Sequence, residues 1–278
     1  MTSARTVFTK VAAILELLLG RRNLVRLARN LTMASRLDVP NSTATNGELL
    51  VQQRVLDQTG PRKAIVFDVG ANVGEWSRVF LERAGERDIQ IHAFEPASST
   101  FQSLRQNFPA GENRIHLVKQ ALSSRAGTAE FFIVGDGSEV NSLHSGLYHT
   151  QGHETVMLNT VDQYCRELSI DHVDFLKIDA EGHDYSVLEG AKAMLEAHAI
   201  SVVQFEYNQR WIEPRHFLKD VFDLMLPLQY SLGKVTPRGI EFYPSYHFEL
   251  ESYREGNYLA CLPDWKSRFP QVKWWNLE

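Results

Sequence analysis

Five short apolar runs, separated by longer helix-like stretches, constrain the fold of this 278-residue chain more than any other feature. The runs are AIVFDV (64–69), IQIHAFE (89–95), RIHLV (114–118), VDFLKI (173–178) and ISVVQFE (200–206). Apolar runs of this length indicate buried strands, and the stretches between them have room for crossover helices. The alternation therefore predicts an α/β fold with a mostly parallel sheet.

Four further segments extend the predicted sheet. TAEFFIV (128–134) and TVMLN (155–159) are predicted as antiparallel additions. PLQYSLGKV (227–235) and NYLACL (257–262) are predicted to form an antiparallel closing hairpin.

The first 36 residues differ in charge from the rest of the chain. They contain seven basic residues and one acid, a net +6, whereas the remainder contains 22 basic and 33 acidic residues, a net −11. Apolar residues recur there at helical spacing, as at Val11, Ile14 and Leu18. Basic amphipathic helices of this kind pack on their own domain, on a partner subunit in a homo-oligomer, or on an anionic membrane surface. The sequence leaves these alternatives open.

The turn-rich stretch 39–47 is predicted as a linker. Residues 1–47 would then form a helical, basic appendage with its linker, and residues 48–278 would form one domain. No apolar run is long enough to cross a bilayer, and the two cysteines are too few for a disulfide framework. We expect a cytoplasmic protein, with peripheral contact at the inner membrane face through residues 1–36 as the alternative. The net charge of −5 gives no reason to expect a nucleic acid partner.

A glycine-containing loop, DVGANVG (68–74), follows the first predicted strand. This is the place where an open α/β sheet binds its ligand. Gly70 and Gly74 let the backbone approach a ligand closely, and Asn72 tolerates a left-handed conformation. The loop lacks the GxGxxG of a pyrophosphate site and the GK[ST] of a phosphate-binding loop.

Two acids narrow the choice of ligand. Asp68, at the end of the first run, would repel a pyrophosphate but suits a ligand with cationic or hydrogen-bond-donating groups. Glu95 ends the second run, where a carboxylate accepts hydrogen bonds from both hydroxyls of a ribose. The two acids and the loop fit an adenosine with an amino-acid tail and no pyrophosphate, and S-adenosylmethionine is such a ligand.

The sequence resembles the FkbM-type methyltransferases over roughly residues 64–208, and NYLACLP (257–263) is similar to the closing strand of that family. The segments that carry the resemblance are VFDVGANVGEWS (66–77), HAFEPASSTFQSLRQN (92–107), QALSSRAGTAEFF (120–132), NTVDQYC (159–165), VDFLKIDAEGHDYSVLEGA (173–191) and VVQFEYN (202–208). The combination of FEP with KIDAEG is its most specific part. The resemblance implies a class I methyltransferase (Rossmann-like) fold, S-adenosylmethionine as cofactor, and O-methylation of sugar or polyketide hydroxyls. The helical spacing in residues 1–36 adds N-terminal helices to this fold.

The resemblance also implies roles for individual positions. Asp68, Gly70, Asn72 and Gly74 would surround the methionine end of the cofactor, Glu95 would bind the ribose, and Ala121, Leu122 and Ser123 would lie near the adenine. In the motif that begins at Asp179, Asp184 stands where the family usually has glutamate.

Carboxylates follow the fourth and fifth runs. Asp179 and Glu181 come after VDFLKI, and Glu206 ends ISVVQFE. Neighbouring parallel strands deliver these side chains to one edge of the sheet. An acceptor hydroxyl is a weak nucleophile and needs a base, a metal ion or both. We predict Asp179, Glu181 and Glu206 as catalytic residues, and Asp179 and Glu206 are also candidate ligands for Mg²⁺.

The predicted function is S-adenosylmethionine-dependent O-methylation of a hydroxyl on a saccharide, glycoconjugate or related natural product. One alternative is a nicotinamide-dependent dehydrogenase, because YSLGK (230–234) matches YxxxK. That motif needs a helix, which Gly233 and Pro237 disfavour. The other alternative is a non-enzymatic cofactor-binding protein, against which the acids at Asp179 and Glu206 argue.

Overall fold

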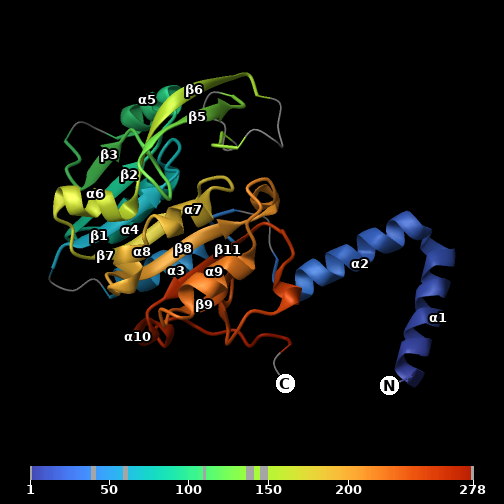
Figure 1. Cartoon of the computed structure of the whole chain (residues 1–278). Coiled ribbons are helices and arrows are strands. Elements are labelled where there is room, and N and C mark those ends of the chain that lie inside the picture. The colour runs from blue at the N-terminus through green and yellow to red at the C-terminus, as the bar shows by residue number, and fades with distance from the viewer. Residues whose placement is uncertain are drawn as a thin grey trace. The chain divides into compact units, whose positions relative to one another are not determined.

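Five parallel strands form the centre of the sheet, as the apolar runs predict. In spatial order they are β3 (Ile115–Val118), β2 (Ile89–Phe94), β1 (Ala64–Val69), β7 (Val173–Ile178) and β8 (Ile200–Tyr207) (Figure 1). This computed structural model describes residues 2–38, 42–58, 62–108, 111–135, 141–144 and 150–276. The chain runs outward from β1 in one direction to β3 and in the other to β7 and β8. The boundary between β1 and β7 is therefore the switch point at which a site is expected.

Antiparallel strands complete the eight-stranded sheet beyond β8. β11 (Gly256–Cys261) lies between β8 and β9 (Ser231–Thr236), and β10 (Gly239–Tyr243) is the edge strand. The predicted antiparallel pairing of 227–235 with 257–262 is confirmed. The tight hairpin, however, joins β9 to β10, which the sequence analysis missed because Gly239 and Glu241 interrupt the apolar pattern of that strand.

A smaller sheet accounts for the predicted antiparallel additions. β5 (Gly127–Ile133) and β6 (Gly152–Asn159) pair antiparallel, and β4 (Ala121–Leu122) pairs with β6. These strands form their own three-stranded sheet and do not extend the main one. The sequence shows the strands but not which sheet they join.

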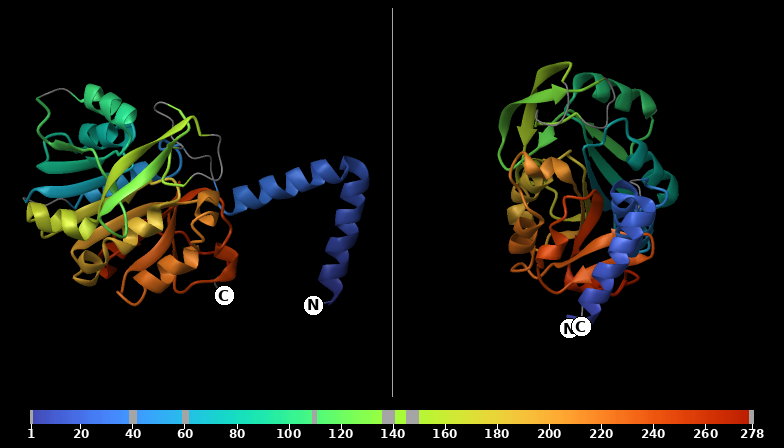
Figure 2. Two further views of the ribbon diagram at one scale, coloured as in Figure 1. Left: turned by 45° about the horizontal axis from the view of Figure 1, so that its top comes forward. Right: turned by 90° about the vertical axis from the view of Figure 1, so that its right-hand side faces the viewer.

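Helices cover both faces of the main sheet (Figures 1 and 2). One face carries α3 (Glu48–Leu56), α4 (Glu75–Ala84), α5 (Ser98–Asn107) and α10 (Pro263–Lys266), and the other carries α6 (Val161–Leu168), α7 (Asp184–Glu189), α8 (Lys192–Glu196) and α9 (Leu218–Met225). Alternate strand residues point to opposite faces. Val66 and Phe175 therefore pack in the core with α3 and α4, whereas Phe67 and Leu176 pack in the other core. By the same alternation, Asp68 and Lys177 point toward α3 and α4.

The chain divides into two compact units, Met1–Pro40 and Asn41–Glu278. The first contains α1 (Thr2–Leu19) and α2 (Arg21–Ser35), which meet at Gly20, whose φ is 72°. None of the helices that the structure describes is long and apolar enough to span a bilayer. Residues 39–41 of the predicted linker lie outside the described residues, but Asn46 and Gly47 are buried. The predicted domain boundary after residue 47 stays a prediction.

Candidate active site

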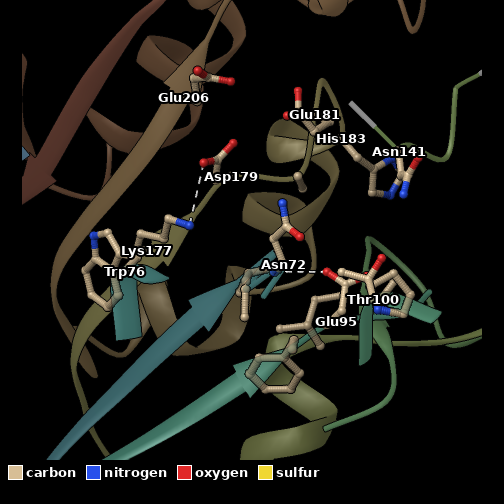
Figure 3. A pocket seen from close by; sticks show the side chains of 18 of the residues that line it. Asn72, Trp76, Glu95, Thr100, Asn141, Lys177, Asp179, Glu181, His183 and Glu206 are labelled. Carbon is tan, nitrogen blue, oxygen red and sulfur yellow. Dashed lines mark hydrogen bonds and ion pairs between the residues drawn. The ribbon is translucent and has the colours of Figure 1, made fainter. Parts of the chain in front are cut away.

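A pocket of about 280 Å³ opens at the carboxyl ends of β1, β2, β7 and β8. In Figure 3, Glu95 and Thr100 lie at one end, Asp179, Glu181 and Glu206 lie at the other, and Asn72 lies between the two groups. The loops that follow these four neighbouring strands meet here, so side chains that are distant in sequence lie in one cavity.

The loop after β1 takes its shape from three residues with positive φ. Gly70, Asn72 and Gly74 have φ angles of 75°, 49° and 87°. The predicted left-handed conformation of Asn72 is confirmed, since Asn adopts it more readily than other non-glycine residues. At Gly70 a Cβ atom would overlap the carbonyl oxygen of Asp179, so glycine lets the loop pack on the end of β7.

Glu95 joins the ends of β1 and β2. Its Oε2 accepts the backbone N–H of Asn72 at 3.0 Å, and its Oε1 accepts that of Ala97 at 2.9 Å. Burial raises the pKa of Glu95 to about 7, although these two N–H groups stabilise the charged form. The carboxylate is therefore fixed in the pocket wall, and its charge changes near neutral pH.

Three polar side-chain atoms around Glu95 are buried, and no described residue forms a hydrogen bond with them. They are Asn72 Oδ1, Thr100 Oγ and Gln120 Oε1, and all three residues line the pocket. A buried polar atom without a partner costs free energy. Two of these atoms are carbonyl-type acceptors, so this end of the pocket suits a ligand that donates several hydrogen bonds.

Asp68 lies beneath the loop and does not line the pocket. It is fully buried, accepts a hydrogen bond from Ser77 at 2.7 Å, and pairs with Lys177 Nζ at 3.0 Å. Lys177 itself lines the pocket, and its Nζ is also 3.6 Å from Asp179. Burial alone would lower the pKa of Lys177, but the carboxylates of Asp68, Asp179 and Glu48 outweigh burial and raise it. Lys177 is therefore a fixed positive charge under the loop.

The three predicted catalytic acids meet at the far end of the pocket. Asp179, Glu181 and Glu206 each place an oxygen within 4.8 Å of the others, a spacing that a metal ion could use. Protein groups already contact them: Arg210 pairs with Glu181 and lies 3.9 Å from Glu206, and Asn208 donates to Glu206 at 2.6 Å.

Crowding changes the ionisation of these acids. Burial, and then the charge of Asp179, raises the pKa of both Glu181 and Glu206, while Arg210 opposes the shift at Glu181. The same causes raise the pKa of Asp184 to about 7. Asp184 does not line the pocket. Its carboxylate accepts a hydrogen bond from the backbone N–H of Glu206 at 3.3 Å, so this aspartate, which stands where the family usually has glutamate, holds the ends of β7 and β8 together. Carboxylates with raised pKa values are suited to taking up a proton.

Ser123 lies behind the pocket wall. Its Oγ is 2.9 Å from Nε2 of His183, and the serine is 4% exposed. Burial lowers the pKa of His183 to about 3, so this imidazole binds a proton too weakly to serve as a base at neutral pH.

The predicted site residues divide into two groups by position. Gly70, Asn72, Glu95, Ala121, Leu122, Asp179, Glu181 and Glu206 line the pocket, whereas Asp68, Gly74 and Ser123 do not. The functional roles assigned to them stay predictions.

Five charged lining residues were missed: Glu48, Glu75, Lys177, Arg210 and Glu255. A lysine inside the apolar run VDFLKI was a usable signal for Lys177, since a charged residue in a buried strand needs partners. Nothing in the local sequence marks Glu48, which lies outside every motif.

Comparison with known proteins gives one family and several relatives. The sequence model of the methyltransferase FkbM domain matches residues 68–232. Hexuronic acid methyltransferase AglP of Haloferax volcanii is 24% identical over 166 residues, which are 60% of this chain and 64% of that protein. 2-O-methyltransferase NoeI of Sinorhizobium fredii is 24% identical over 207 residues, 69% of this chain and 83% of that protein. The match to AglP thus spans less than two thirds of that protein.

Among solved structures, the methyltransferase FkbM from Methylobacillus flagellatus is similar. It has 15% sequence identity and a TM-score of 0.45, and the alignment covers 71% of this chain and 43% of that one.

Proposed function

Since the chain belongs to the methyltransferase FkbM domain family, we propose that it transfers the methyl group of S-adenosylmethionine to a hydroxyl of a saccharide or glycoconjugate. One observation carries the proposal: a single pocket joins a cluster of three acids to the Glu95 carboxylate and to acceptor atoms near it that form no hydrogen bond with any described residue. The saccharide class is supported by the relative named for hexuronic acid, and O-methylation by the relative named as a 2-O-methyltransferase.

The residues around Glu95 fit the cofactor. S-adenosylmethionine supplies an electrophilic methyl group on a sulfonium ion. Glu95 would accept hydrogen bonds from the ribose hydroxyls, and Ala121 and Leu122 would contact the adenine. Oδ1 of Asn72 and Oε1 of Gln120, to which no residue in the described ranges donates a hydrogen bond, would gain donors from the ligand.

The acids at the other end would handle the proton of the acceptor. An acceptor hydroxyl becomes a better nucleophile when a carboxylate takes its proton. Asp179 is the most open of the three, with its side chain 38% exposed, whereas Arg210 and Asn208 contact Glu181 and Glu206. We assign Asp179 as the base, with Glu206 and Glu181 orienting the acceptor.

A Mg²⁺ ion held by Asp179 and Glu206 is the alternative form of this proposal. The mechanism in which Asp179 acts as the base without a metal ion is favoured, because Lys177 and Arg210 already place two positive charges beside these carboxylates. A divalent cation at this position would be repelled by both side chains.

The dehydrogenase alternative has no support in this site. Tyr230 and Lys234 lie just before and within β9, not on a helix, so their Cα atoms are separated by roughly 13 Å of extended chain. The Tyr230 hydroxyl donates to the carbonyl of Ile200.

Calorimetric titration with S-adenosylmethionine and with NADH tests the proposed methyl transfer, followed by a methyl-transfer screen on oligosaccharides and glycolipids. Binding of NADH without binding of S-adenosylmethionine would refute it.

For the first unit we propose contact with an anionic membrane surface. Val11, Ile14 and Leu18 of α1 are 47%, 59% and 73% exposed and lie at helical spacing on one face. In α2, Leu27 and Leu31 share a face in the same way. A net charge of +6 in residues 1–36 complements anionic lipid. Assembly of a homo-oligomer through the same faces is the competing use.

A further inference from the structure

Thr100 has a buried hydroxyl in the pocket that the protein itself does not satisfy. The residue lies in the first turn of α5, is 2% exposed, and lines the pocket beside Glu95 (Figure 3). Among the residues that the structure describes, none forms a hydrogen bond with its Oγ. A buried hydroxyl without a partner costs free energy, and a ligand that supplied the partner would recover that cost.

A threonine in another helix of this chain finds its partner within that helix. Thr32 Oγ of α2 donates to the carbonyl of Ala28 at 2.9 Å. Bonding to the carbonyl four residues earlier is a common arrangement for a helical threonine. At Thr100 the residue four positions earlier is Pro96, which precedes the helix, and no such bond forms. The Thr100 hydroxyl is therefore not used by its own helix.

The first turn of α5 is held in place from two sides. Ala97, which precedes the helix, donates its N–H to Glu95 Oε1 at 2.9 Å, and Ser98 donates its N–H to Glu154 of β6 at 2.7 Å. Thr100 follows two residues later and, as a β-branched residue in a helix, has only two favoured χ1 rotamers. The reach of its hydroxyl is therefore set relative to the Glu95 carboxylate.

The Thr100 hydroxyl adds a hydrogen-bond donor to a group of acceptors. Asn72 Oδ1 and Gln120 Oε1, the other buried atoms around Glu95 that no described residue bonds, are carbonyl oxygens and can only accept. Each oxygen of ionised Glu95 accepts one backbone N–H and has room for a second donor. A hydroxyl group on a ligand matches Glu95 and Thr100 together, since it can give its proton to the carboxylate and accept the proton of the threonine.

We propose that Thr100 is a specificity-determining residue for the nucleoside of the cofactor: its hydroxyl donates a hydrogen bond to one oxygen of the ribose diol, while Glu95 accepts the protons of the diol. This inference rests on the proposed use of S-adenosylmethionine. A site that pairs a ligand hydroxyl in both directions rejects an analogue that lacks it, because the groups of the site are then buried without partners. Thr100 thus makes the pocket selective for ribose over deoxyribose.

Calorimetric titration with the reaction product S-adenosylhomocysteine and with its 2′-deoxy and 3′-deoxy analogues tests this, at a pH about one unit above the pKa of Glu95. Thr100→Val keeps the shape of the side chain and removes its hydroxyl. It should weaken binding of S-adenosylhomocysteine by about 3- to 10-fold, the loss of one neutral hydrogen bond. For at least one analogue, the one without the hydroxyl that Thr100 contacts, the same substitution should change Kd by less than about twofold. Thr100→Ser keeps a hydroxyl and should retain the wild-type preference for ribose.

Thermal unfolding separates this role from a purely structural one. Because valine removes a buried polar group that has no partner in the free protein, Thr100→Val should leave the Tm of the ligand-free protein unchanged or raise it. The increase in Tm on addition of S-adenosylhomocysteine should be smaller in this variant than in the wild type. Thr32→Val removes a helical hydroxyl outside the pocket and is the matched control, which should leave Kd for all three ligands unchanged.

Two results would overturn the inference and leave the proposed function in place. One is wild-type affinity for S-adenosylhomocysteine in Thr100→Val. The other is a loss of the same size for all three ligands, since the hydroxyl would then act elsewhere than on the ribose; a lowered Tm of the free variant beside that equal loss would mark the hydroxyl as structural. A wild-type protein that binds neither S-adenosylmethionine nor S-adenosylhomocysteine would remove the proposed function, and the inference with it.

Discussion

Glu95 makes cofactor affinity depend on pH in a defined direction. In the free protein its pKa is raised to about 7, because burial disfavours the charge more than the N–H groups of Asn72 and Ala97 favour it. An ionised carboxylate accepts the ribose hydroxyls better than a protonated one. Affinity for S-adenosylmethionine should therefore rise as pH increases through about 7 and fall below it.

The size of the effect follows from the fraction of ionised Glu95. At pH 6, one unit below its pKa, roughly one tenth of the carboxyl groups are ionised. If only the ionised form binds well, the apparent Kd at pH 6 is about tenfold higher than at pH 8. Glu95→Gln resembles the protonated form at every pH. At pH 8 it should weaken binding by about 1.5–3 kcal/mol, or roughly 10- to 150-fold.

Calorimetric titrations of both proteins at pH 6, 7 and 8 measure this. The amino group of the ligand titrates in both proteins alike, so the difference between wild type and Glu95→Gln isolates the carboxylate. Near pH 7 the wild type should also release protons on binding, which appears as a dependence of the measured heat on the buffer. A difference between the two proteins that stays constant from pH 6 to pH 8 would refute the reasoning, as would wild-type affinity in a folded Glu95→Gln protein.

Further predictions concern the chemistry, the loop and the first unit. Asp179→Asn and Glu206→Gln should each lower kcat by at least about 100-fold with little change in cofactor affinity; activity within a few-fold of wild type in both would contradict their roles. Excess EDTA should leave turnover unchanged, and a loss that Mg²⁺ restores would instead support the metal form. Gly70→Ala, where φ is 75° and a Cβ atom would overlap Asp179, should cost more than about 1 kcal/mol and lower Tm by at least about 2 °C in thermal unfolding. Deletion of residues 1–36 should leave cofactor affinity unchanged and abolish salt-sensitive flotation on anionic vesicles; a full-length protein that never floats would exclude the membrane contact.

Much of the fold followed from local pattern. The five apolar runs became β1, β2, β3, β7 and β8, because a buried parallel strand must be apolar on both faces. The sheet membership of β5 and β6 did not follow, since an alternating strand has the same sequence signature in either sheet. β10 was not predicted, because its short apolar run contains Glu241, and nothing in the local sequence indicates that this glutamate is buried.

The candidate site was predictable to a similar degree. The acids at the ends of β7 and β8 were expected to meet, because parallel neighbours end at one edge, and their oxygens do lie within 4.8 Å of one another. Asp68 was expected at the ligand because it ends a strand. Instead, strand alternation turns it toward the buried Lys177, and the two neutralise each other inside the protein.

The sequence by itself determined backbone conformation over short distances: the strands, the left-handed Asn72, and the glycine at the tight turn after β1. These depend on steric limits and side-chain periodicity within a few residues. Only the tertiary structure decided which distant side chains share the pocket. Glu48 bonds to Asn257, 209 positions away, and it reaches the pocket because α3 packs on a sheet whose strand order places β11 beside β8. Strand order and helix packing result from the summed burial of the whole core, and no local stretch of sequence contains that sum.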